Sequence, residues 1–369
     1  MNFEDVFPKV MRRGGFDALV GNPPYRMIQP HNTDVALIEY LRSHYVAAEF
    51  KIDLFHLFLQ RASMLLTKGA LLGYIVPTTL LNNVYAESLR KYLMDHCEIR
   101  TIAVAKGLVF ENADVHTCVV VLQQQEDETK RSRSRIMTTS QLSEEFTANP
   151  NYESSSIQGD YLDLSGCIWN ILVNEKNVSL IKKLISQNSP LKDVAGLNRG
   201  LITGDRSKYF SPSKLSKEYV PIVGGGDVQR YYVTPPSEYV LFVRPETAGG
   251  CWDEEVHLAP HKIVVRQIGY GPTASILKDK IAVTGNIFTV MGKSLEYFVC
   301  WLGIIISKVA NFFWRTMFND FKSSFPQVTL FSLGQLPVRP IIQSDAHVEQ
   351  ANSDITKLVM EIVELMGRC

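Results

Sequence analysis

Short apolar runs alternate with helical patterns through the first third of the chain. FDALVG (16–21) and ALLGYIV (70–76) are continuous apolar runs bounded by polar residues or proline, which is typical of buried strands. Between them, apolar residues recur at i, i+3, i+4, i+8 and i+11, on one face of a predicted helix: Leu54, Leu57, Phe58, Ala62 and Leu65. Strands that alternate with helices predict parallel strands joined by crossover helices.

The same alternation continues to about residue 123. NVYAESLRKYLMDH (83–96) predicts another helix, and IRTIAVA (99–105) and HTCVVVLQ (116–123) predict two more strands. Residues 16–123 therefore predict an α/β fold, half of a doubly wound Rossmann-like sheet.

The pattern changes beyond residue 123. The charge-dense stretch 123–135 predicts a surface loop or a domain boundary, and short strands between Gly, Pro and Asn clusters follow from about residue 165. Residues 294–318 and 346–367 have helical patterns. We therefore predict a first domain at 1–135, a linker at 136–165, a β-rich domain at 166–345 and a C-terminal helix at 346–369.

Composition narrows the class of protein. The 369 residues are 46% hydrophobic, with 38 basic and 38 acidic residues, so a globular protein is expected whose net charge indicates no partner. The six cysteines show no paired spacing, so we expect reduced cytoplasmic thiols and no metal site. The most apolar stretch, 297–306, is too short to span a bilayer, and the N-terminal residues contain no apolar signal segment.

The tetrapeptide Asn22, Pro23, Pro24 and Tyr25 follows the first predicted strand, at the edge where open α/β sheets place ligands. The two prolines make the loop stiff and poor in donors. The side-chain oxygen of Asn22 and the carbonyl of Pro23 could accept both hydrogens of an aromatic amine, so that its nitrogen lone pair faces an electrophile. Tyr25 offers a ring on which a planar base can stack. A rigid Pro-Pro turn that only caps the strand is the alternative.

These segments resemble a known family. GGFDALVGNPPY, KIDLFHLFLQRASMLLTKGALLGYIVPTTLL and the run to VFENADVHTCVVVL are similar to motifs IV to VIII of N6-adenine DNA methyltransferases of the TaqI-like and type IIG restriction-modification kind. The resemblance implies S-adenosylmethionine as methyl donor and a flipped adenine as substrate. It also implies that Phe110 stacks on the flipped base, and that Asn22, Asp53, Leu54 and Phe55 line the cofactor and base pocket. Packing in the core is the alternative for Phe110.

The later segments LNRGLITGDRSKYF (197–210), VPIVGGGDVQRYY (220–232) and 318–340 resemble the target-recognition domain of the same enzymes. Double-stranded DNA is thus the expected partner. A local basic cluster is expected to contact its backbone, with Gly200 and Gly204 letting main-chain N–H groups approach phosphates. A solvated basic turn is the alternative. The cluster comprises Arg199, Arg206, Lys208, Lys214 and Lys217.

The cofactor loop of this family, F-x-G-x-G after a first strand, normally precedes N-P-P-Y, and only 21 residues precede Asn22. The Gly clusters at 224–226, 249–250 and 269–271 lie in the predicted β-rich domain without a helix pattern after them, so they are weak candidates. We expect an incomplete cofactor site, and an exposed strand edge that pairs with an N-terminal cofactor-binding segment or with a second copy of the chain.

Two other functions fit parts of the sequence. The chain could be a DNA-binding specificity module of a split or truncated enzyme that performs no chemistry. It could also methylate glutamine in proteins, because such enzymes carry N-P-P-Y as well. The long region after the last catalytic motif favours DNA as the substrate.

Overall fold

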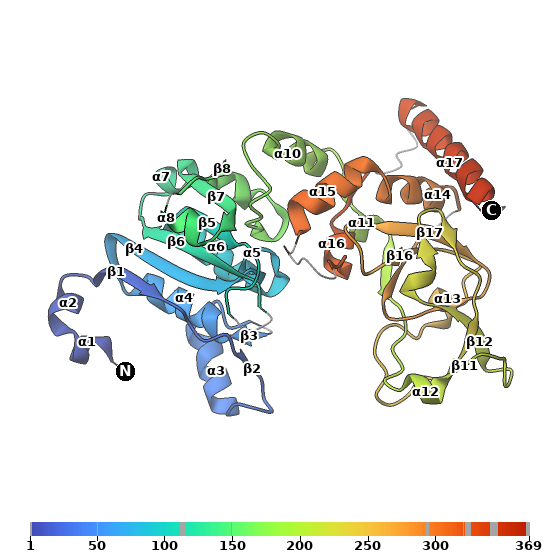
Figure 1. The fold of residues 1–369 in the computed structure, drawn as a ribbon, viewed down its shortest axis with the longest axis horizontal. Coiled ribbons are helices and arrows are strands. Elements are labelled where there is room, and N and C mark those ends of the chain that lie inside the picture. Colours follow the sequence, from blue (N-terminus) through green and yellow to red (C-terminus); the bar gives the residue numbers. More distant parts are fainter. Residues whose placement is uncertain are drawn as a thin grey trace. The chain divides into compact units, whose positions relative to one another are not determined.

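The computed structural model describes residues 2–49, 51–110, 115–148, 150–292, 295–319, 321, 326–339 and 346–366. The chain divides into two compact units (Figure 1). The first unit comprises Met1–Lys182 with Met317–Ser323, and the second comprises Lys183–Thr316 with Ser324–Cys369.

A mixed six-stranded sheet forms the centre of the first unit. Its order is β1 (Phe16–Gly21), β4 (Leu66–Pro77), β6 (Thr117–Gln124), β5 (Cys97–Ala105), β7 (Arg135–Leu142) and β8 (Ser154–Ile157). β1 runs parallel to β4, and β5 runs parallel to β7. β6 is antiparallel to both of its neighbours, so the expectation of parallel strands throughout is wrong for this strand.

Helices cover one face of this sheet. Leu72, Val76, Val120 and Leu122 alternate along β4 and β6 and have no exposed surface, because α4 (Leu54–Met64) packs on β4 and α6 (Glu87–His96) packs beside it on β5. The other elements of this unit are α1 (Phe3–Val6), α2 (Pro8–Arg12), β2 (Met27–Ile28), α3 (Val35–His44), β3 (Ile52–Asp53), α5 (Thr79–Asn82), η1 (Val84–Ala86), α7 (Glu128–Arg133), α8 (Glu144–Ala148), α9 (Gln158–Leu162) and η2 (Ser165–Cys167).

The opposite face of the sheet is open where β1, β4 and β6 form it. Val20, Gly73 and Val121 lie side by side on these three strands. Val20 is 89% exposed, Leu71 is 44% exposed, and a Cβ atom added to Gly73 would meet nothing within 4 Å. β1 is also an edge strand, since β4 is its only neighbour among the described strands. We call Val20, Leu71, Gly73 and Val121 the open face.

The second unit is rich in β-strands, as expected. One four-stranded sheet has the order β10 (Gly196–Arg199), β19 (Ile287–Met291), β16 (His261–Arg266) and β17 (Thr273–Lys278). Another has the order β11 (Phe210–Ser211), β15 (Glu238–Leu241), β12 (Tyr219–Val223) and β18 (Ala282–Val283). Two short ladders pair β13 (Val228–Gln229) with β14 (Tyr232–Val233), and β9 (Ser189–Pro190) with β20 (Pro337–Val338).

The remaining elements of the C-terminal half are helical. They are α10 (Val178–Ser186), α11 (Leu191–Val194), α12 (Arg206–Tyr209), η3 (Gly225–Asp227), α13 (Glu254–His257), α14 (Leu295–Ile305), α15 (Lys308–Phe318), α16 (Leu330–Gly334) and α17 (Ala346–Met366). No single helix in the described ranges is long and apolar enough to cross a membrane; α14 and α15 meet that test only as a pair, across a bend of 59°.

Two sequence-based boundaries are wrong. The predicted linker at 136–165 contains β7, β8 and α9, and both strands belong to the first sheet. The charge-dense stretch 123–135 holds the short helix α7 inside the first unit, so it is not a domain boundary. The first unit therefore extends to Lys182 instead of residue 135, because strand pairing adds segments that have little hydrophobic pattern of their own.

Candidate functional site

The N-P-P-Y turn lies at the carboxyl end of β1, beside the end of the parallel strand β4. Asn22 and Pro24 are exposed, Pro23 is buried, and Tyr25 is half-buried. The side chain of Asn22 makes no hydrogen bond to any described residue. The buried proline fixes the turn to the sheet, and the amide of Asn22 remains available to a ligand.

Tyr25 is held by a hydrogen bond and by two aromatic contacts. Its hydroxyl donates to the carbonyl oxygen of Ile75 at 2.9 Å, on the neighbouring strand β4. Burial raises the pKa of Tyr25 to about 12, with a smaller contribution from Cys118, so the phenol keeps its proton and acts as a donor. Its ring meets the ring of Phe55 edge to face at 6.1 Å and that of Phe110 at 6.3 Å.

The two rings beside Tyr25 differ in exposure. Phe55 is 1% exposed, so it supports Tyr25 from within the core, and its contact with a cofactor stays a prediction. Phe110 is half-exposed and inclined by 67° to Tyr25. A base held between two parallel rings needs them about 7 Å apart, twice the ~3.4 Å stacking repeat of DNA. Phe110 must therefore rotate before a base can lie between it and Tyr25.

Asp53 lies next to the turn through a short ladder. β2 pairs with β3, and the N–H of Leu54 donates to the carbonyl of Arg26 at 2.9 Å. The Oδ1 atom of Asp53 is buried and has no hydrogen-bond partner in the described part of the chain. Burial raises the pKa of Asp53, against the opposing effect of the main-chain N–H groups of Phe55, Leu54 and Arg26. A buried acceptor without a partner suits a ligand donor, and half-buried Leu54 lies beside it; contact of both residues with a cofactor stays a prediction.

Tyr74 is a neighbour that the sequence did not reveal. It pairs with Gly21 across β1 and β4, and a Cβ atom on Gly21 would lie 3.1 Å from the Tyr74 ring. The main chain entering Asn22 thus runs closely past an aromatic ring. Only the register of the two strands brings these residues together, so no local signal identifies Tyr74.

Comparison with known proteins fits this geometry. Residues 1–110 match the family described as Eco57I restriction-modification methylase, and residues 220–338 match the TaqI-like C-terminal specificity domain. The chain thus contains one segment similar to each of these two families of restriction-modification proteins. The recognition drawn from N-P-P-Y and from the later β-rich segments is confirmed at this level.

Two curated relatives and one solved structure illustrate the similarity. The putative type II restriction enzyme and methyltransferase RM.MjaORFECS2P of Methanocaldococcus jannaschii is 26% identical over 382 residues, which is 96% of this chain and 30% of that protein. The type II restriction enzyme and methyltransferase RM.Eco57I of Escherichia coli is 26% identical over 230 residues, 58% of this chain and 22% of that protein. The chain thus spans less than a third of the length of either relative.

The fold is also similar to the type IIL restriction-modification enzyme MmeI, solved in complex with DNA. The TM-score is 0.62 at 9% identity, covering all of this chain and 51% of that one. The fold prediction, a methyltransferase-like sheet followed by a β-rich region, is confirmed.

In the second unit, part of the predicted basic cluster is already engaged. Arg206 pairs with Glu238, and its guanidinium lies 4.1 Å from the centre of the Phe210 ring. Arg199 donates to the carbonyl of Gly285 at 2.7 Å, and Lys208 lies over the ring of Tyr209. Lys214 and Lys217 are exposed. DNA contact by these five residues stays a prediction.

The expected role of Gly200 is wrong. A Cβ atom at this position would lie 2.2 Å from the carbonyl oxygen of Thr284, and Leu201 forms a bridge with Thr284. Gly200 therefore permits two main-chain segments of the second unit to approach each other, and its N–H already donates to the carbonyl of Ile287 at 2.9 Å, so this N–H is not available to a phosphate. Gly204 has φ +77° and serves a left-handed turn.

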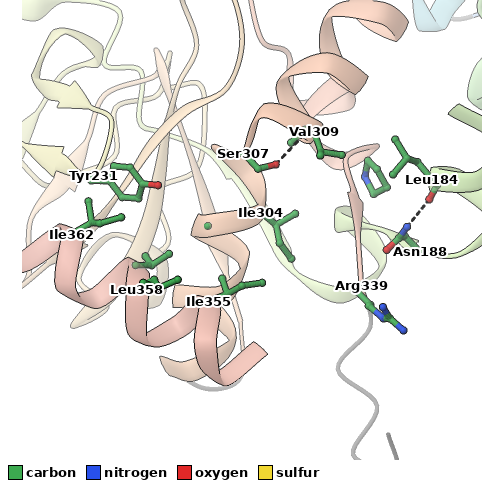
Figure 2. A pocket seen from close by; sticks show the side chains of 14 residues that line it. Leu184, Asn188, Tyr231, Ile304, Ser307, Val309, Arg339, Ile355, Leu358 and Ile362 are labelled. Atoms are coloured by element: carbon green, nitrogen blue, oxygen red, sulfur yellow. Dashed lines mark hydrogen bonds between the residues drawn. The ribbon is translucent and has the colours of Figure 1, made fainter. Parts of the chain in front are cut away.

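A cavity of about 490 Å³ lies elsewhere in the second unit, between α14, the start of α15, β20 and α17 (Figure 2). Its walls are mainly apolar, including Ile304, Ile355 and Leu358. Of its polar side chains, the Asn188 amide already donates to the carbonyl of Leu184 at 2.8 Å. The described residues that line the cavity include no carboxylate, imidazole or thiol, so it is a weaker candidate for a catalytic site than the N-P-P-Y turn.

Proposed function

We propose that this chain forms the base-binding and DNA-reading part of an adenine-N6 DNA methyltransferase of a restriction-modification system. The observation that carries the proposal is the exposed Asn22 at the carboxyl end of β1, next to the fixed turn of Pro23 and the anchored ring of Tyr25. The match to restriction-modification methylases supports methyl transfer, and the specificity domain favours DNA over a protein substrate.

In this proposal the residues act on the base through position and polarity. The side-chain oxygen of Asn22 and the carbonyl of Pro23 accept the two hydrogens of the adenine amino group, which directs its lone pair outward. Tyr25 stacks on the flipped base, and its hydrogen bond to Ile75 keeps the ring in place. Phe110 rotates to cover the other side of the base.

S-adenosylmethionine would supply the methyl group. Asn22 and Asp53, whose Oδ1 atom is buried without a partner, fit one side of its site. Among the described residues of the first unit, no Gly cluster follows a strand and opens a helix, so the remaining contacts are expected from another polypeptide segment. The unpaired edge of β1 and the open face support a segment that adds a strand and a covering layer. A second copy of the chain is the alternative partner for the edge of β1 and the open face. The cytoplasmic location expected from the cysteines stays a prediction.

The test is a methylation assay with labelled methyl donor and mixed-sequence DNA, with and without the cofactor-binding region of a curated relative. Digestion of the DNA to nucleosides separates N6-methyladenine from methylated cytosines. We expect N6-methyladenine in the mixture, and a loss of about 10² to 10³ in rate for Asn22→Ala, as for one preorganised polar partner. Asn151→Ala, which changes an exposed asparagine of the same unit, is the matched control.

The outcomes separate the candidate functions. Methylated cytosine alone contradicts the choice of adenine, and unchanged turnover in Asn22→Ala removes Asn22 from the mechanism. DNA binding without methylation under either condition favours the specificity module that performs no chemistry.

A further inference from the structure

One face of α15 carries a groove that the functional site does not use. The groove has a volume of about 410 Å³ and is lined by Lys308, Asn311, Phe312, Arg315 and Thr316. These residues follow each other at i, i+3, i+4, i+7 and i+8, so they share one side of the helix. The opposite side of α15 is anchored in the specificity domain, where the indole nitrogen of buried Trp314 donates to Ser332 at 3.0 Å.

The groove is positively charged. Lys308 and Arg315 are exposed, and neither forms an ion pair with any carboxylate in the described ranges. The printed sequence of α15, KVANFFWRTMF, contains no acidic residue. The two cations therefore have no internal partner, in contrast to Arg206, which is paired with Glu238.

The spacing of these charges fits the backbone of a nucleic acid. Arg315 follows Lys308 by seven positions along the helix, about 10 Å at a rise of 1.5 Å per residue. Phosphates of one DNA strand advance about 3.4 Å per nucleotide along the axis, so this separation corresponds to about three nucleotides. Two side chains lie between the cations. One is the side-chain amide of Asn311, which makes no hydrogen bond to a described residue, and the other is the half-buried ring of Phe312.

The loop 269–271 lies next to one of the residues that line the groove, Asn311. A Cβ atom on Gly271 would lie 2.2 Å from the side-chain nitrogen of Asn311, so the loop lies directly against α15. The N–H of Gly269 donates to Pro326, and that of Val328 donates to Gln267, which fixes the loop. Tyr270, at its tip, is 69% exposed.

We propose that this face of α15, with Lys308 and Arg315 as its cations, binds the phosphate backbone of double-stranded DNA. The inference rests on the proposed function, that the chain acts on DNA, and it names a contact surface separate in sequence from the cluster at 199–217. Asn311 donates to a phosphate or sugar oxygen between the two cations. These contacts position the duplex and carry no sequence information.

The test compares the complete chain with the Lys308→Gln/Arg315→Gln variant. Affinity for a labelled mixed-sequence duplex is measured by fluorescence anisotropy over a range of potassium chloride concentrations. Each phosphate contact contributes about 0.9 to the slope of log affinity against log salt, so we expect the magnitude of the slope to fall by about 1.8. The variant Lys9→Gln/Lys357→Gln, which removes two exposed lysines from α2 and α17, should keep the parental slope.

Two results would overturn the inference in different ways. An unchanged slope in the double variant, with salt-dependent binding by the parent chain, refutes the α15 surface and leaves the proposed function standing. No salt-dependent binding by the parent chain refutes both. Asn311→Asp provides a second measurement, because a negative charge between the cations should weaken binding while both cations stay in place.

Discussion

Arg90 provides a direct test of how the first unit is held together. Its side chain has no exposed surface and donates to four carbonyl oxygens, those of Leu80, Asn83, Gly166 and Cys167, at 2.6 to 3.0 Å. The first two follow β4 beside the N-P-P-Y turn, and the last two belong to η2. One guanidinium thus ties a segment that was expected to be linker or second domain to the helices and strands of the first unit.

The substitution Arg90→Met keeps most of the volume and removes every donor. Each buried carbonyl left without a partner costs about 1–3 kcal/mol, and breaking a buried charged network typically costs about 3–5 kcal/mol in total. We expect a loss of about 3–5 kcal/mol. Because 1.4 kcal/mol is a factor of about ten, amide exchange in β5 and β6 should accelerate by about 10² or more wherever it proceeds by global opening of the unit.

Hydrogen exchange followed by mass spectrometry measures this directly, with Arg100→Met as the control. Arg100 lies on β5, its side chain is 51% exposed and it pairs with Glu98, so its loss should change stability by about 1 kcal/mol or less. Exchange in Arg90→Met that stays within threefold of the parent chain would refute the reasoning. It would mean that water replaces the guanidinium and that residues 165–167 are not held by it.

Three further outcomes are expected. Burial lowers the pKa of His56 from 6.5 to about 4, so the folded state favours the neutral ring. The contribution of His56 to the free energy of unfolding is therefore fully present above pH 6.5 and falls by about 3 kcal/mol as the pH decreases to 4. Urea unfolding of His56→Leu should show a free energy of unfolding that depends less on pH between 6.5 and 4. Gly200→Ala should destabilise the second unit by about 2 kcal/mol or more, since its Cβ would overlap the Thr284 carbonyl. The thermal unfolding temperature of Gly226→Ala, which has open space around the added Cβ, should shift little. Val20→Lys should leave the free energy of unfolding of this chain within about 0.5 kcal/mol of the parent value, because Val20 is 89% exposed. The same substitution should weaken association with a cofactor-binding segment in a pull-down. Equal association would show that this segment does not cover the open face at Val20.

The sequence predicts the elements that have a strong local pattern. FDALVG forms β1 with the expected bounds, and the helical periodicity after Asp53 becomes α4. The position of N-P-P-Y at a strand end follows directly from these elements. β7 and β8 were missed because RIMTTSQL and SSSI contain few apolar residues, and they become strands only by pairing within the sheet.

The candidate site could be predicted only in part for the same reason. Asn22 to Tyr25 are contiguous, so the motif reveals them. Phe110 reaches Tyr25 from 85 positions along the chain, and Tyr74 lies beside Gly21 through strand register. The groove on α15 was missed because the sequence predicts one continuous helix over 294–318. The structure has a break between Ile305 and Lys308, and this break determines which face of α15 is exposed.

β1 links the open edge of the sheet to the chemistry of the site. Its sequence is that of a buried strand, yet Val20 is exposed and, among the strands that the structure describes, only β4 pairs with it. A strand added in parallel to the free side would lie about 4.8 Å from β1 and would end level with it. The loop that follows such a strand would then begin beside Asn22, at the edge where open α/β sheets bind ligands. If the proposed function holds, a segment that pairs with β1 in this way would also contribute a wall to the cofactor site, so one added polypeptide is expected both to cover the free edge of β1 and to support methyl transfer.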